Sequence, residues 1–169
     1  MPENRPRLAK FLVLSALSLC IGTLHGMLQV MPPIRRWLDS IGSPYSNPGH
    51  MIDPLAHAHM NLVGGVILFV MGATYHLLPA VSGRRIHSAR LVEATFWFTA
   101  LGAYAFYGVQ MVFGIWLGVL TDGTPEYDAL YRYHGPCVAV AGTTMAIGFF
   151  CYMVNIVQTV RQPAGLQPR

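Results

Sequence analysis

The residues in this sequence with the clearest capacity for chemistry are its histidines, because imidazole binds transition metals and changes charge near neutral pH. Four of the seven histidines are predicted to lie at one depth of a membrane bundle, and these are His25, His57, His59 and His134. At 1.5 Å of rise per residue, they share a layer roughly 10 Å thick. An ionisable side chain within an apolar span is costly and normally faces the bundle interior. This layer is therefore the candidate site.

The pair His57 and His59 can be interpreted geometrically, since residues two apart on an α-helix point about 200° apart around its axis. The two imidazoles cannot share one iron, so each is expected to meet a different group. An axial heme ligand needs a partner imidazole from another helix. His25 is the candidate partner of His59, because its depth matches on an antiparallel neighbouring helix. His76 and His87 are expected near the opposite end.

Several other features are open to two interpretations. The histidines of the layer could simply hydrogen-bond to loops at the membrane interface. Asn61 and the glycines that follow it could admit a flat macrocycle, or could equally let a neighbouring helix pack closely. Tyr104, Tyr107 and Gln110 form a stripe, which could line a pocket for a quinone or a heme propionate; a packed aromatic stripe is the more common meaning of such spacing.

The composition indicates that a bilayer surrounds these residues. The chain has 169 residues, of which 53% are apolar and 11% charged, and its mean hydropathy is +0.43. Soluble domains carry about 25% charged residues, so a soluble enzyme, a disordered tail and a nucleic-acid-binding module are all disfavoured. Three cysteines within or beside apolar runs argue against a disulfide scaffold. The sequence holds no CxxCH motif for covalent heme attachment.

Four apolar segments reach the roughly 20 residues needed to cross the hydrocarbon core. They predict an all-α, integral membrane four-helix bundle that forms one domain over residues 1–169. The basic N-terminus and its apolar run are expected to be a retained first span rather than a cleaved signal peptide. The predicted spans cover about Leu8–Met31, Leu55–Leu78, Leu91–Leu120 and Pro136–Val160.

The basic residues predict that both termini are cytoplasmic. Eight of the eleven lysines and arginines fall on the side that holds the termini, and three fall on the other side. Five of the seven acids lie on that other side, including Asp53 and Asp122, which agrees with the same orientation. The eight basic residues are Arg5, Arg7, Lys10, Arg84, Arg85, Arg90, Arg161 and Arg169.

The segment that begins at His57 resembles helix ten of subunit I in the superfamily of heme-copper oxygen reductases and nitric oxide reductases. The residues that carry the resemblance, at their particular spacing, are His57, Ala58, His59, Gly65, Gly72, Tyr75, His76, Pro79, Ser82 and Gly83. The resemblance covers about 100 residues and includes, more weakly, the stretch Pro125–Ala129. It implies that His57 would ligate a high-spin heme and His59 a low-spin heme.

The chain also departs from that family. It has no His-His dipeptide and no His-Pro-Glu segment, so copper is not expected and reduction of oxygen or nitric oxide by this chain alone is doubtful. The paired arginines that hold heme propionates in many members are missing. Arg132, or Arg35 and Arg36, could replace them by position only.

The sequence thus predicts a b-type heme electron-transfer protein in the cytoplasmic membrane of a prokaryote, with iron ligands among His59, His57 and His25. His134 and Arg132 complete the candidate cofactor-binding set. Expected partners are lipid, other membrane or periplasmic redox subunits such as a c-type cytochrome, and a second copy of the chain with heme between copies. The alternatives are a cofactor-free structural or assembly subunit, and a heme protein whose open site binds a diatomic gas.

Overall fold

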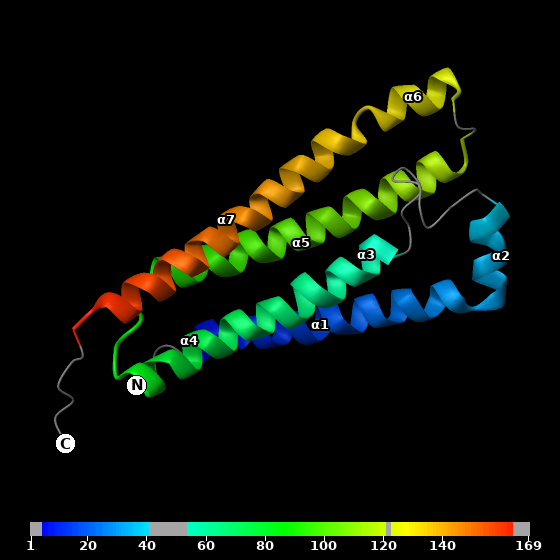
Figure 1. Cartoon of the computed structure of the whole chain (residues 1–169). Helices are drawn as coiled ribbons and strands as arrows, with labels where there is room; N and C mark the ends of the chain where they lie inside the picture. The colour runs from blue at the N-terminus through cyan, green and yellow to red at the C-terminus, as the bar shows by residue number, and fades with distance from the viewer. Residues whose placement is uncertain (1–4, 41–53, 121–122, 164–169) are drawn as a thin grey trace.

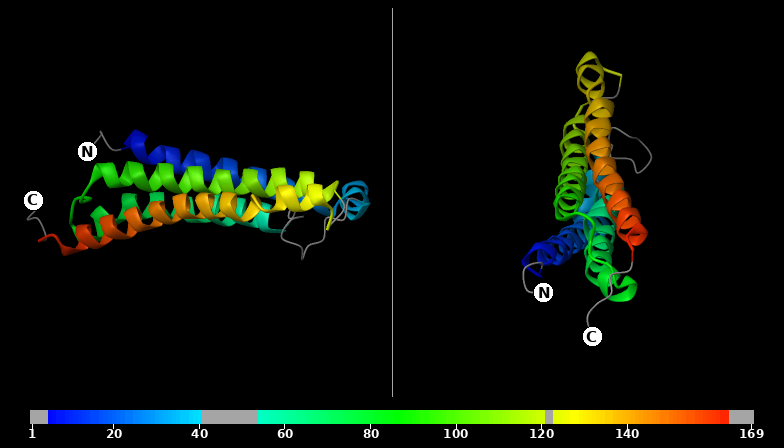
Figure 2. Two further views of the ribbon diagram at one scale, coloured as in Figure 1. Left: turned by 90° about the horizontal axis from the view of Figure 1, so that it is seen from above. Right: turned by 90° about the vertical axis from the view of Figure 1, so that its left-hand side faces the viewer.

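The computed structural model describes residues 5–40, 54–120 and 123–163, and the described residues are mostly helical and include no strand. Four helical stretches are long and apolar enough to cross a membrane, as the sequence predicts. Figure 1 shows them running alongside one another, and Figure 2 shows how elongated the bundle is. The stretches are α1 (Arg5–Val30), the continuous run α3 (Pro54–His59), η2 (Met60–Ile67) and α4 (Leu68–Ser82), then α5 (Ala89–Gly118) and α7 (His134–Arg161).

Two short helices lie where the sequence predicts only loops. Helix α2 (Pro32–Ser40) follows α1 directly, and α6 (Pro125–Tyr131) precedes α7. Proline suits the first turn of a helix because its missing N–H would have no partner there. In α6 the side chain of Thr124 also caps the helix by accepting from the backbone N–H of Tyr127. Asp53, Asp122 and Arg169, which contribute to the predicted orientation, lie outside the described residues.

The second span contains a feature that the sequence does not predict. Its middle, η2, is a π-helix of eight residues between two α-helical parts. The span ends at Gly83, whose φ of 66° lies in the left-handed region that glycine adopts without strain. Ser88 then caps α5, because its hydroxyl oxygen accepts from the backbone N–H of Leu91.

The four long stretches pack as two hairpins. Helix α1 lies against α3, η2 and α4, while α5 lies mainly against α7. Small residues let α5 and α7 approach closely: a Cβ added to Gly102 would stand 2.5 Å from the backbone nitrogen of Met145. A Cβ added to Gly148 would stand 2.6 Å from the backbone nitrogen of Thr99. Such glycine contacts are typical of helices that associate in lipid, where close van der Waals packing drives association.

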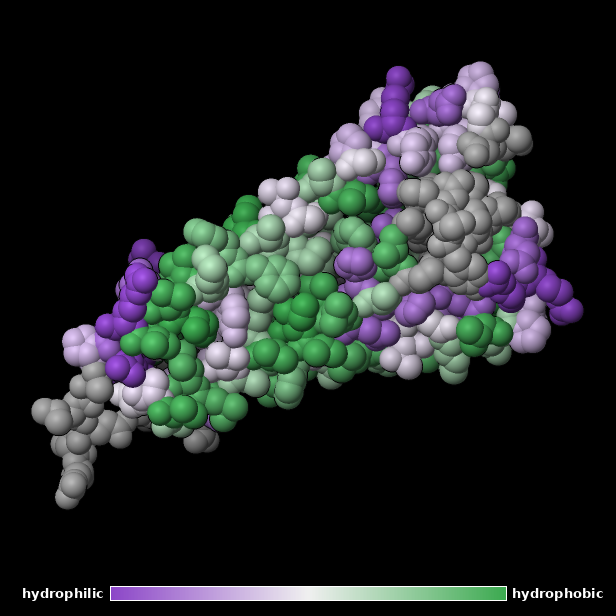
Figure 3. Space-filling view, viewed as in Figure 1, coloured by the Kyte–Doolittle hydropathy of each residue, from purple (hydrophilic) through white to green (hydrophobic). Residues whose placement is uncertain are grey.

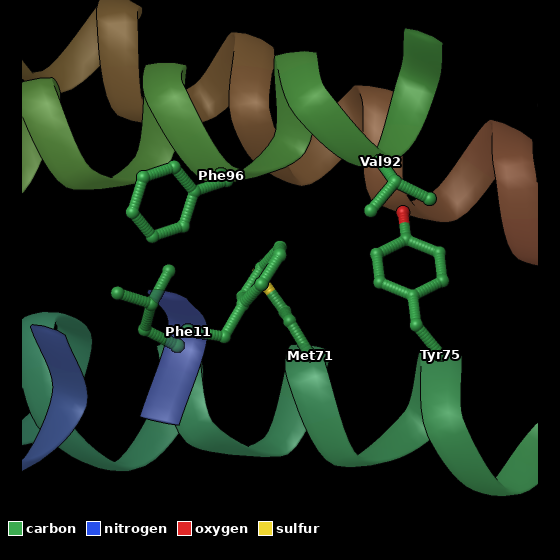
Figure 4. Packing of buried hydrophobic residues seen from close by; sticks show 6 residues of the cluster. Phe11, Met71, Tyr75, Val92 and Phe96 are labelled. Carbon is green, nitrogen blue, oxygen red and sulfur yellow. The ribbon is translucent and has the colours of Figure 1, made fainter. Parts of the chain in front are cut away.

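The two hairpins meet through buried side chains. The largest cluster joins α1, α4 and α5 near the end that holds the termini, and Figure 4 shows its aromatic rings turned toward one another. Phe11 contacts Phe96 and Tyr75 edge to face, with ring centroids 5.0 and 6.1 Å apart. The Tyr75 hydroxyl shares a 2.9 Å hydrogen bond with Thr95.

The surface agrees with a bilayer setting. On the face shown in Figure 3, apolar side chains cover the middle of the molecule and hydrophilic ones gather toward its two ends. Large apolar side chains such as Val140, Phe150 and Met153 of α7 are exposed. Lipid would cover such a belt, and the polar ends would reach the headgroups.

Candidate functional site

The histidine pair of α3 faces two different neighbours. The ring of His57 lies against α1, where Gly26 leaves room for it: a Cβ on Gly26 would stand 3.1 Å from His57 Cδ2. The ring of His59 lies instead against Phe106 of α5, with ring centroids 4.3 Å apart. The two-sided arrangement expected from the spacing is therefore present.

His59 is oriented by its own backbone. Its Nδ1 lies 2.9 Å from the carbonyl oxygen of Leu55, one turn earlier. A carbonyl can only accept, so Nδ1 carries the proton and the lone pair of a neutral ring is on Nε2. Histidines that bind metals are commonly fixed in this way, with one nitrogen donating to a carbonyl and the other free to coordinate.

His25 has a different environment. It is buried, and its Nε2 lies 2.9 Å from Nε2 of Gln29, which donates through its amide. In the neutral ring the proton is then on Nδ1, which lies 3.2 Å from the hydroxyl of Tyr107. The ring contacts His57 edge to face, with centroids 5.8 Å apart. The structure thus brings His25 to His57, whereas matching depths suggested His59, because His57 is the member of the pair that faces α1.

His134 is the first residue of α7, and Arg132 lies just before it, at the C-terminal cap of α6. His134 Nε2 lies 3.2 Å from Oε1 of the buried Gln110 on α5. The His134 ring also stacks on Tyr131 at 6.0 Å between centroids. Arg132 is exposed, donates from Nε to the carbonyl of Ala129 at 3.1 Å, and places its guanidinium over the ring of Tyr133.

The stripe on α5 connects this helix to α1 and to α7. Tyr104 shares a 3.1 Å hydrogen bond with Ser18 of α1, Tyr107 contacts His25, and Gln110 contacts His134. The glycines of the second span serve close packing on α1: a Cβ on Gly72 would stand 2.6 Å from Phe11 Cβ. Of the two interpretations of the stripe and the glycines, helix packing is the one that these contacts support.

The donor set can be tested against a metal ion and against heme. Within the ranges that the structure describes, no three His, Cys, Asp or Glu side chains gather closely enough to hold a bare metal ion. Heme iron needs only axial imidazoles, because the porphyrin nitrogens fill its equatorial positions. His59 fits that need on one side of an iron. The His25–His57 contact does not provide a ligand pair, since Gln29 and Tyr107 occupy the ring nitrogens of His25.

Two contributors to the site are not evident from the sequence. One is the π segment that follows His59 directly, for which the adjacent Gly64 and Gly65 were the available signal, since glycine pairs accompany helix irregularities. The other is Ser15, a buried hydroxyl on α1 that bonds to the backbone of that segment. Serine within a transmembrane span usually bonds to its own helix, so its type alone does not identify this role.

Comparison with known proteins finds bacterial relatives. The chain is 30% identical over 118 residues to the cbb3-type cytochrome c oxidase subunit CcoN1 of Stutzerimonas stutzeri, a match covering 63% of this chain and 25% of that protein. It is 40% identical over 121 residues to the alternative cytochrome c oxidase subunit 1 of Bradyrhizobium diazoefficiens, covering 68% of this chain and 20% of that protein. No protein family model matches the chain.

The chain thus spans about a fifth to a quarter of the length of the curated relatives that it matches. Their names support the superfamily that the sequence resembles. The four apolar helices and these relatives together indicate that the chain is a multi-pass prokaryotic membrane protein related to the first subunits of cytochrome c oxidases.

Proposed function

We propose that this chain binds heme b and relays single electrons as a subunit of a larger oxidase-related complex in the cytoplasmic membrane, without a copper site of its own. The observation that carries the proposal is the hydrogen bonding of the His59 ring. Its Nδ1 is held by the carbonyl of Leu55 and its Nε2 carries the lone pair of the neutral ring. The partial similarity to cytochrome c oxidase subunits supports heme as the group that His59 binds.

The chain's own residues would prepare one axial position. The Leu55 carbonyl fixes the tautomer of His59, and Phe106 limits rotation of its ring. The surrounding bundle is apolar, and its low dielectric together with the hydrogen bond on the imidazole would tune the reduction potential of a bound iron. When bound, heme would supply one-electron transfer between a periplasmic donor such as a c-type cytochrome and the rest of the complex.

The second axial ligand has two sources under this proposal. His25 can serve only after it leaves Gln29 or Tyr107, because both of its ring nitrogens are engaged. Alternatively, another polypeptide supplies the ligand, and a second copy of this chain is one such source. His57 faces away from His59 and is assigned to a separate group. Arg132, exposed at the outer end, is assigned to a heme propionate.

The test is heme content. The purified chain in nanodiscs should show the sharp reduced-minus-oxidised α-band of a six-coordinate b-type heme. His59→Ala should lower the ratio of low-spin heme to protein by about tenfold or more, since an axial ligand is lost. His76→Ala is the matched control, because His76 is exposed on α4 and outside the layer. Equal heme content in the two variants would contradict the assignment of His59.

A second function, that of a cofactor-free structural or assembly subunit, is favoured by a specific observation. His25 and His134 are both satisfied by protein partners, namely Gln29, Tyr107 and Gln110. Such bonds stabilise a bundle without any cofactor. Folded wild-type protein without heme, after expression with heme supplied, would favour this function. Carbon monoxide binding to the reduced protein would instead indicate an iron with an open coordination position.

A further inference from the structure

The π-helical segment η2 determines where the histidine pair points. It runs from Met60 to Ile67 and follows His59 directly. A π turn closes i→i+5 hydrogen bonds, so it accommodates about one residue more than an α turn. One extra residue rotates the preceding helix by roughly 100° relative to an unbroken α-helix. The contacts of His57 with α1 and of His59 with Phe106 therefore depend on η2 keeping its π form.

That form changes how backbone groups pair. Where η2 passes into α4, the N–H of Leu68 is shared between the carbonyls of Val63 and Gly65. In a bilayer no water replaces a weakened backbone hydrogen bond, so another protein group must do so. A donor from a neighbouring helix can therefore stabilise the segment at a carbonyl that shares its backbone N–H with another acceptor.

Ser15 of α1 supplies that donor. Its Oγ donates to the carbonyl of Gly65 at 2.8 Å, and Ser15 is only 2% exposed. Gly65 allows α1 to come this close, because a Cβ at that position would stand 2.6 Å from Cδ2 of Leu19. The contact links residues 50 positions apart in the chain, so it depends on the packing of the hairpin and not on local sequence.

Ser18 provides a natural comparison on the same face of α1. It is equally buried, but its hydroxyl donates to the carbonyl of Leu14 in its own helix at 2.8 Å and shares a hydrogen bond with Tyr104 of α5. Neither partner is a backbone group of η2. Comparing variants of the two serines therefore distinguishes the effect of the bond to η2 from the general effect of losing a buried hydroxyl.

We infer that Ser15 is a positioning residue: its hydroxyl holds η2 in the π form and thereby fixes the direction in which His57 and His59 point. The role of the pair in heme binding rests on the proposed function. The direction of the imidazoles is a property of the chain itself and can be measured without heme.

The experiment compares Ser15→Ala with Ser18→Ala in nanodiscs, using ring-nitrogen NMR of labelled histidines. Ser15→Ala should shift the ring signals of His57 and His59, and should raise amide hydrogen exchange across 63–69 by about fivefold or more. Ser18→Ala should leave the His57 and His59 signals at their wild-type positions. Ser15→Thr, which keeps the hydroxyl, should restore them.

A deletion variant provides a second test in case Ser15→Ala folds poorly. Removing the exposed Val66 takes one residue out of η2. The span can then form a continuous α-helix in which the residues before and after η2 point in the same directions as in the full chain. In that background Ser15→Ala should not move the histidine signals. Signals unchanged by Ser15→Ala in the full chain, or moved equally in the deletion background, would overturn the inference.

Heme supplies a separate readout. In chain that binds heme, Ser15→Ala should change the g-values of the low-spin iron, because the orientation of the axial imidazole changes. Wild-type protein without heme would contradict the proposed function, while the NMR comparison would still decide the role of Ser15.

Discussion

His25, His59 and His134 of the histidine layer have different hydrogen-bond partners, and these partners determine what each residue can do. His59 uses one ring nitrogen for its own backbone and keeps the lone pair on the other. His25 uses both nitrogens, for Gln29 and Tyr107. His134 uses Nε2 for Gln110. Among these three, His59 is the residue best prepared to bind an iron without rearrangement.

The bond between His25 and Tyr107 gives a prediction at this scale. Tyr107→Phe removes the partner of the His25 Nδ1–H in a buried setting, so we expect the free energy of unfolding to fall by about 1 kcal/mol or more. Denaturant titration in mixed micelles measures the change. Tyr152→Phe is the control, because its ring contacts Tyr75 but its hydroxyl makes no hydrogen bond within the described residues. Equal losses in both variants would contradict this account.

The candidate site could be predicted only in part. The period of an α-helix was enough to predict that His57 and His59 face opposite sides, and hydropathy was enough to place His25 at a similar depth. The partner of each ring nitrogen was not predictable, because it depends on side chains from α5 and on the rotation of α1. Depth alone favoured His59 as the neighbour of His25, whereas rotation places His57 there.

At the scale of elements, α5 and α7 form the hairpin that depends most on glycine. Gly148 of α7 meets the side chain and backbone of Thr99, and Gly102 of α5 meets the backbone of Met145. These close approaches leave no space for a Cβ without a shift of one helix. The adjoining linker is also fixed to α7, since Asn155 accepts from the N–H of Ser88 and donates to its carbonyl, each at 3.0 Å.

Gly148→Ala should therefore destabilise the chain. The new Cβ would lie 2.6 Å from the backbone nitrogen of Thr99, and moving backbone is costly, so we expect a loss of about 1–3 kcal/mol. Gly142→Ala on the same helix is the matched control, because nothing lies within 4 Å of its added Cβ. It should be neutral or stabilising by up to about 1 kcal/mol. Thermal unfolding in nanodiscs measures both; similar melting temperatures would contradict the prediction.

The elements themselves were predictable to within a few residues where hydropathy defines them. The expected span Leu91–Leu120 corresponds to α5 at Ala89–Gly118. Helix α2 was not predicted, because its prolines are typical of loops although here they occupy the first turn of a helix. The π form of η2 was not predicted either, since it requires a donor from α1 that lies far away in sequence.

At the scale of the whole molecule, charge and hydropathy are arranged along the bundle axis. On the face shown in Figure 3 an apolar belt crosses the middle, and in Figure 1 the end that holds α2 and α6 is opposite the end that holds the linker between α4 and α5. The linker carries Arg84 and Arg85, and Lys10 pairs with Glu93 near that same end. The histidine layer lies toward the other end, where a periplasmic redox partner would approach under the proposed orientation.

That orientation is testable with cysteine labelling. In a chain whose Cys20, Cys137 and Cys151 are replaced, single cysteines are introduced as Arg85→Cys in the exposed linker and as Glu126→Cys on the exposed face of α6. Because basic residues favour the cytoplasmic side, a membrane-impermeant maleimide added to intact spheroplasts should label position 126 and leave position 85 unlabelled. Permeabilised membranes should label both positions, which controls for reactivity. Labelling of position 85 in intact spheroplasts would place the termini outside, and the histidine layer would then face a cytoplasmic electron donor.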